Sequence, residues 1–76
     1  MASNIKELLD HYPSPKAAAK AAGTVRTAGY HWFSSPPVIP GDKALIAMAA
    51  DQNLSEEQTN LILVDAARKR IERRSS

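Results

Sequence analysis

The first apolar positions of the chain recur three or four residues apart, which is the spacing of one helix face. They fall within residues 4–12 and consist of Ile5, Leu8, Leu9 and Tyr12. Ser3 is suited to cap the start of this predicted helix, because a serine hydroxyl accepts a hydrogen bond from a first-turn N–H. Pro13 ends the helix, since proline disfavours helical backbone in the residue before it.

The segment KAAAKAAG predicts a second helix over residues 15–22. Ser14 stands at the N-cap, Pro15 at the first helical position, where its missing N–H is harmless, and Gly23 just after the last turn. Alanine combines the highest helix propensity with almost no bulk. Another helix can therefore approach the backbone of this one closely.

The segment TVRTAGYHWF follows without a linker and predicts a third helix, which starts at Thr24 or Val25 and is closed by Phe33. Gly29 weakens this helix by up to about 1 kcal/mol relative to alanine. Trp32 falls on the face that meets the second helix and is expected in the core.

A proline-rich loop, SSPPVIPG, separates the third helix from the fourth. Val38 and Ile39 are expected to reach from this loop back to the core. Asp42 is predicted to cap the fourth helix. The apolar face of that helix consists of Leu45, Ile46, Met48 and Ala49.

The residues SEEQ, from Ser55 to Gln58, match a capping box and predict a long helix that continues to about Arg73. Ile62 points to one side of this helix. The other apolar residues form a stripe made of Leu61, Val64, Ala67 and Ile71, with Leu63 at its edge. No segment alternates as a strand does, so the sequence predicts an all-α domain of five helices.

The composition excludes several classes of chemistry. The 76-residue chain has no cysteine and two histidines, His11 and His31, which rules out a disulfide framework and supplies no set of zinc ligands. No nucleophile–base pair or phosphate-binding loop appears, so we expect neither an enzyme nor a cofactor or metal. No apolar run approaches about 18 residues and the N-terminus is polar, so a cytoplasmic location without membrane contact is expected.

The formal net charge is only +2, a mild basic bias, so the position of the charges matters more than their sum. Five of the ten basic residues lie between Arg68 and Arg74. They close a helix that Glu56 and Glu57 open, which is the arrangement that the helix dipole favours. We therefore favour a structural role for this basic end over a second contact with nucleic acid.

The second and third helices together match a helix-turn-helix, in which a slim helix and a glycine turn precede a helix rich in hydrogen-bonding side chains. The two helices of that motif cross at close range, and the outer face of the second reads bases in the major groove. From Leu9 to about Ala50 the sequence also resembles the small all-helical Cro-type repressors of temperate phages and their prophage relatives. The resemblance rests on LDHY, KAAAKAAG, IPGDKALIAMAA and the Ala19–Gly23–Trp32 spacing.

The resemblance implies a role for each polar side chain of the motif. Contacts to bases would come from Val25, Arg26 and Thr27. The Arg26 guanidinium can bridge O6 and N7 of guanine, a contact worth about 1–3 kcal/mol of discrimination. Contacts to the DNA backbone would come from Lys16, Lys20, Tyr30, His31 and Lys43. Gly29 stands where the family usually has Val or Ile as an inward anchor, so the resemblance implies a third helix that is loosely packed and orders fully only on DNA.

These observations predict a sequence-specific DNA-binding transcriptional regulator, a Cro-like repressor that covers promoter DNA at a palindromic operator. Residues 1–54 would form the helix-turn-helix core, and residues 55–76 a C-terminal helix that either caps the core or dimerises. A homodimer on double-stranded DNA is expected, with half-sites about one helical turn apart. The contacts between the two copies of the chain would come from Leu61, Ile62, Val64 and Ile71.

An alternative is a phage-encoded protein-interaction module, an inhibitor or adaptor of a host protein built on the same scaffold. The mild net charge and the missing side chain at Gly29 favour this alternative. Excisionase and antitoxin roles are close relatives of the main prediction, and the sequence does not separate them.

Overall fold

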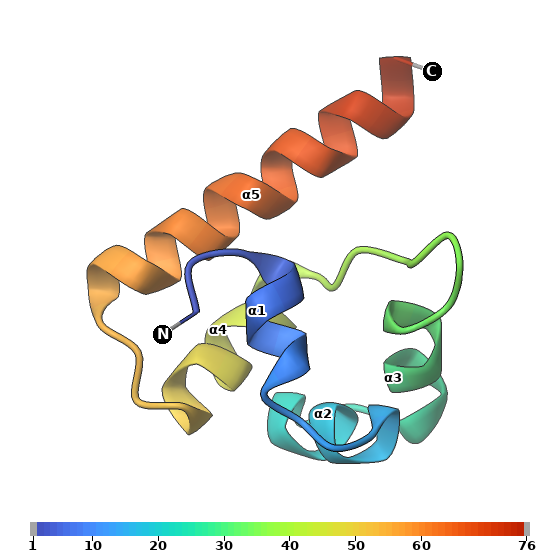
Figure 1. Cartoon of the computed structure of the whole chain (residues 1–76), viewed down its shortest axis with the longest axis vertical. Coiled ribbons are helices and arrows are strands. Elements are labelled where there is room, and N and C mark those ends of the chain that lie inside the picture. The colour runs from blue at the N-terminus through green and yellow to red at the C-terminus, as the bar shows by residue number, and fades with distance from the viewer. Residues whose placement is uncertain (1, 76) are drawn as a thin grey trace.

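The computed structural model describes residues 2–75, and within them the chain forms five helices and no strand (Figure 1). The helices are α1 (Ile5–Asp10), α2 (Pro15–Ala22), α3 (Arg26–Trp32), α4 (Asp42–Asp51) and α5 (Glu56–Ser75). The predicted all-α architecture with a long last helix is confirmed. Figure 1 shows α5 lying across one end of the molecule, with α2 and α3 at the opposite end.

Two helices begin at a different cap from the one predicted. Asn4, and not Ser3, caps α1, because its side-chain oxygen accepts a hydrogen bond from the Glu7 N–H at 2.9 Å. The Ser3 hydroxyl instead donates to the Glu7 carboxylate at 2.9 Å. Gly41 is the N-cap of α4, which makes Asp42 its first helical residue. In both cases the error is a single residue.

The bounds of α2 agree with the prediction, because local capping chemistry determines both of its ends. The Ser14 hydroxyl accepts a hydrogen bond from the Ala17 N–H at 3.2 Å, and Pro15 is the first helical residue. Gly23 follows the last turn with φ 72°, in the left-handed region that favours glycine. The capping box of α5 is confirmed as well.

The core lies where α1, α4 and α5 meet. Its fully buried side chains include Leu8, Leu45, Met48 and Ile62. Trp32 joins them from α3 and is 6% exposed, as the sequence predicted. Because α5 supplies part of this core, residues 2–54 and the last helix share a single apolar interior.

Two apolar residues expected in the core lie on the surface instead. Ile46 is 49% exposed, because it follows Leu45 on α4 and a step of one residue turns a side chain by about 100°. Val38 is also 49% exposed. The loop residues that turn inward are Ile39, which packs partly against the core, and Pro40, which is fully buried.

The inner face of α5 is the one that carries Ile62. Ile62 and Ala66 are fully buried in the domain's own core. The prediction that Ile62 contacts a second copy is therefore wrong, since no part of its side chain reaches the surface. Arg70 extends this attachment, because its guanidinium donates to the Pro40 carbonyl at 2.7 Å and pairs with Asp42 at 3.0 Å.

The Asp65 side chain joins α5 to the start of α1. Its carboxylate accepts a hydrogen bond from the Ile5 N–H at 3.0 Å and pairs with Lys69 at 2.9 Å. Ile5 is the first helical residue, so its N–H has no partner within α1. Burial raises the pKa of Asp65, but the Ile5 hydrogen bond and the Lys69 charge outweigh burial and hold the pKa below its usual range.

We expect Asp65→Asn to destabilise the fold at neutral pH. Because the pKa is lower in the folded than in the unfolded chain, ionised Asp65 stabilises the fold above the ordinary aspartate value of about 3.9. That stabilisation is lost as the pH falls through the lower, folded-state pKa. The substitution should reduce the free energy of unfolding by about 1 kcal/mol at pH 7 and by less at pH 3. Urea unfolding followed by circular dichroism at both pH values measures it.

The matched control is Glu72→Gln, which removes an exposed carboxylate from the same helix. It should leave the free energy of unfolding at pH 7 within about 0.5 kcal/mol of the wild type. If Asp65→Asn has the same free energy of unfolding as the wild type at pH 7, the role given to this carboxylate is contradicted.

Candidate nucleic-acid interface

The turn between α2 and α3 consists of three residues, 23–25. The left-handed backbone of Gly23 allows the Thr24 N–H to donate to the Ala19 carbonyl at 3.0 Å, which closes α2. Val25 is extended and forms the N-cap of α3. Thus α3 begins one or two residues later than the sequence predicted, and Val25 precedes the helix.

The backbones of α2 and α3 are in close contact at Gly29. This glycine is buried, and a Cβ atom added to it would overlap the Pro15 carbonyl oxygen and lie 3.0 Å from the Ala19 Cβ. No side chain fits between the two helices at this point. The predicted crossing of the two helices at close range is confirmed, and glycine is required at this point. The loose packing expected for α3 is not found.

The direction of the α3 side chains follows from this crossing. Gly29 and Trp32 are the buried residues of the helix. The residues on the other side are consequently turned to solvent: Arg26, Thr27, Tyr30 and His31.

All five residues that were predicted to contact DNA from α3 and its cap are exposed. Val25 is 68% exposed and Tyr30 is 54% exposed. The guanidinium of Arg26 forms no ion pair with any side chain of residues 2–75. The structure thus brings two charged or ionisable side chains, a hydroxyl, a phenol and an aliphatic group onto one open surface.

The three predicted lysines fall into two groups. Lys16 and Lys20 are exposed one turn apart on α2, the helix that supports α3. Lys43 is exposed at the start of α4, next to Asp42, which pairs with Arg70 of α5. The structure therefore places Lys43 where α4 meets α5 and not on the helix-turn-helix.

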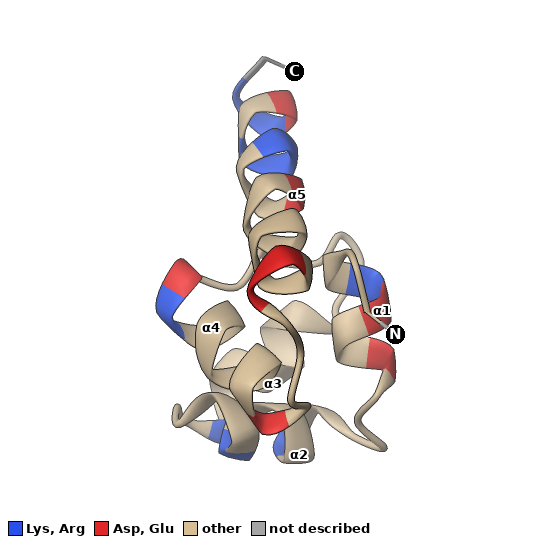
Figure 2. Cartoon of the chain, turned by 90° about the vertical axis from the view of Figure 1, so that its left-hand side faces the viewer, with Lys and Arg blue, Asp and Glu red and all other residues tan. Residues whose placement is uncertain are grey.

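The helix-turn-helix lies in a part of the chain that has no acidic residue. From His11 to Gly41, 31 consecutive residues contain no Asp or Glu, while they contain Lys16, Lys20 and Arg26. Figure 2 shows blue segments on α2, and red segments at the starts of α4 and α5. The modest net charge of the whole chain hides this local excess of positive charge, which attracts phosphate groups.

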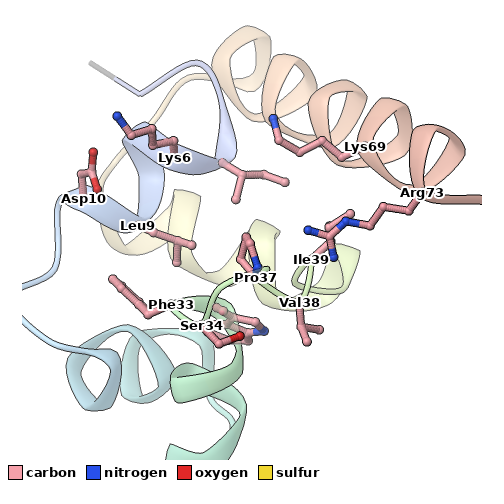
Figure 3. A pocket seen from close by; sticks show the side chains of 12 residues that line it. Lys6, Leu9, Asp10, Phe33, Ser34, Pro37, Val38, Ile39, Lys69 and Arg73 are labelled. Carbon is pink, nitrogen blue, oxygen red and sulfur yellow. The ribbon is translucent and has the colours of Figure 1, made fainter. Parts of the chain in front are cut away.

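A separate groove of about 420 Å³ lies between α1, the loop after α3 and the second half of α5 (Figure 3). Its walls are mostly apolar and include Leu9, Phe33 and Val38, with Lys6 and Lys69 at the edge. Sequence reasoning missed it, because three segments far apart in the chain form it. The partial exposure of Val38 is explained by its position in this wall.

No three His, Asp or Glu side chains within residues 2–75 come together in a way that could hold a metal ion. In the same range, no helix is both long and apolar enough to span a bilayer. Comparisons of the chain with family models, curated proteins and solved structures give no match.

We expect Gly29→Ala to destabilise the protein, although alanine is the better helix former. The added Cβ would force α3 away from Pro15 and cost about 1–3 kcal/mol, against a gain in helix propensity of up to about 1 kcal/mol. Thermal and urea unfolding of the purified variant measure the net loss.

Gly41→Ala is the control, because a Cβ atom at Gly41 meets no other atom within 4 Å. This change should cost less than about 1 kcal/mol, which is the weak preference of an N-cap for glycine over alanine. Equal losses of stability in Gly29→Ala and Gly41→Ala would contradict a close crossing at Gly29.

Proposed function

We propose that the protein is a sequence-specific DNA-binding transcriptional regulator that reads duplex DNA with α3. One observation carries the proposal: the close crossing at Gly29 holds α3 on α2 so that its polar side chains form a single exposed row. The stretch from His11 to Gly41, which contains this row, has no Asp or Glu but has Lys16, Lys20 and Arg26, and this local positive charge suits the phosphate backbone.

In this function α3 lies in the major groove, and its side chains divide by chemistry. Arg26 offers two parallel N–H groups to O6 and N7 of a guanine, and Thr27 bonds either a base or a phosphate. Val25 contacts a thymine methyl group. Tyr30 and His31 lie farther along the helix and bond phosphates, as do Lys16 and Lys20 from α2.

The regulatory effect that fits a domain of this size is steric. A bound protein covers promoter DNA and excludes the polymerase, which is how a Cro-type phage or prophage repressor acts. The sequence resemblance supports this identity through the same alanine helix, glycine turn and Trp32 that form the motif in the structure.

A second candidate function is a module that binds another protein. The groove between α1 and α5 favours this function, because its apolar walls would bury side chains of a partner. Reversing the charge of Lys16, Lys20 and Arg26 together separates the two functions. A DNA reader loses its duplex, whereas a module that uses the groove keeps its partner.

Selection of duplexes from a random pool at fixed salt, followed by fluorescence anisotropy, tests DNA reading directly. Arg26→Ala should lower the protein's preference for a selected duplex over scrambled DNA by about 1–3 kcal/mol of binding free energy, because a bidentate guanine contact disappears. Lys6→Ala is the control. It removes an exposed basic residue from α1, which packs on α4 and α5, and should leave this preference unchanged.

We expect Lys20→Ala to act on all duplexes alike. Removing one phosphate contact should lower affinity for selected and scrambled DNA equally and reduce the slope of log affinity against log salt by about 1. The same anisotropy titrations, repeated at several salt concentrations, measure this slope. A pool that returns no enriched sequence with the wild-type protein would refute the proposed function.

A further inference from the structure

The outer face of α5 carries an apolar stripe that the domain itself does not cover. Leu61, Val64 and Ile71 are 48%, 52% and 61% exposed. Together with Arg68 they recur at steps of three, four and three residues. This is the spacing of the a and d positions of a coiled-coil seam, at which two helices pack side by side.

The stripe and the buried face lie on opposite sides of α5. Ile62 and Ala66 are fully buried, and Arg70 bonds to the same side. At 100° per residue, the mean direction of this buried set differs from that of the stripe by roughly 160°. A second helix can therefore approach the stripe from the side of α5 that faces away from the core.

The charges of α5 favour one orientation of such a second helix. Its first turn carries Glu56 and Glu57, and its last turn carries Arg73 and Arg74. Figure 2 shows the red start of α5 and its mainly blue far end. A second α5 in antiparallel orientation places acidic turns beside basic turns at both ends of the pair, whereas a parallel one places like charges together.

The apolar residues agree with the antiparallel orientation. An antiparallel pair shares each layer between an a position of one helix and a d position of the other. The layers are then Leu61 against the second copy's Ile71, and Val64 against the aliphatic stem of the second copy's Arg68. Both ends of the seam are apolar, and the two central layers are half apolar.

We propose that this stripe is a self-association surface on which α5 of a second copy of the chain packs in antiparallel orientation. With 20 residues, α5 is about 30 Å long. Two such helices bury less than the roughly 1,600 Å² of a standard interface, so we expect a reversible pair that is detected at concentrations of about 100 µM. The seam includes no residue of α3, so the row of polar side chains on α3 remains open.

Self-association does not depend on the proposed function. Where both hold, the pair carries two α3 helices related by a two-fold axis, which suits a palindromic operator. Experiments without DNA therefore test the pairing of α5 separately from DNA reading.

The orientation is tested by disulfide cross-linking, for which the absence of native cysteine is an advantage. Two single variants, Leu61→Cys and Ile71→Cys, are oxidised mildly at about 100 µM, first separately and then as an equal mixture. In antiparallel pairs like positions lie about 15 Å apart, so each variant alone should stay uncross-linked while the mixture forms a 61–71 disulfide. Cross-linking of each variant alone would show a parallel pair and overturn the proposal.

Sedimentation equilibrium without DNA tests the surface itself. The wild-type chain should show reversible dimers, and Val64→Lys should raise the dissociation constant at least about tenfold, because it places a second cation beside Arg68. Ile46→Lys is the matched control, since Ile46 on α4 is exposed to nearly the same extent and lies outside the stripe. It should sediment like the wild type.

Circular dichroism of all four variants checks that they fold. A wild-type chain that stays monomeric up to about 500 µM, or a dimer that Val64→Lys leaves unchanged, would overturn the proposal. If the wild-type chain stays monomeric, the stripe is instead a surface for binding a different protein.

Discussion

The contact between the backbone of α3 at Gly29 and the first turns of α2 is the constraint on which the candidate interface depends. The alanines of α2 and the missing side chain of Gly29 are both needed, because a larger side chain on either helix would hold the two backbones apart. Once the two backbones touch, the inner side of α3 is determined, and Arg26, Thr27, Tyr30 and His31 are left outside. The chemistry of the exposed surface is therefore a consequence of packing on the opposite side of α3, where Gly29 contacts α2 and Trp32 enters the core.

The predictions from sequence succeeded where the signal is local. The serine, proline and glycine around α2 gave its bounds to the residue, because capping involves groups three or four positions apart. Gly29 was misinterpreted for the opposite reason. A glycine within a helix indicates weakness when it is considered alone, and its close approach to Pro15 becomes visible only when the crossing of two helices is known. The groove and the position of Lys43 likewise depend on segments that are distant in the chain.

The last helix shows the limit of periodicity as a guide. Its stripe of Leu61, Val64 and Ile71 is the more regular apolar pattern, yet Ile62 and Ala66 face the core. A hydrophobic pattern shows that a face will be covered, but not by what. Hydrogen bonds reinforce this orientation, since Asp65 and Arg70 reach α1 and the loop before α4 from the side that bears Ile62. The two faces of α5 thus serve different purposes, one within the domain and one on its surface.

The hydrogen bond between the Ile5 N–H and Asp65 spans sixty positions of the chain, from its first helix to its last. A helix of six residues does not persist by itself in water, so α1 depends on its packing against α4 and α5. Closing so long a loop carries an entropic cost that only the completed core offsets. We therefore expect α1 to be lost together with the core and not to fray independently of it. Helix α1 and the part of α5 that carries Asp65 would then unfold as a single cooperative unit.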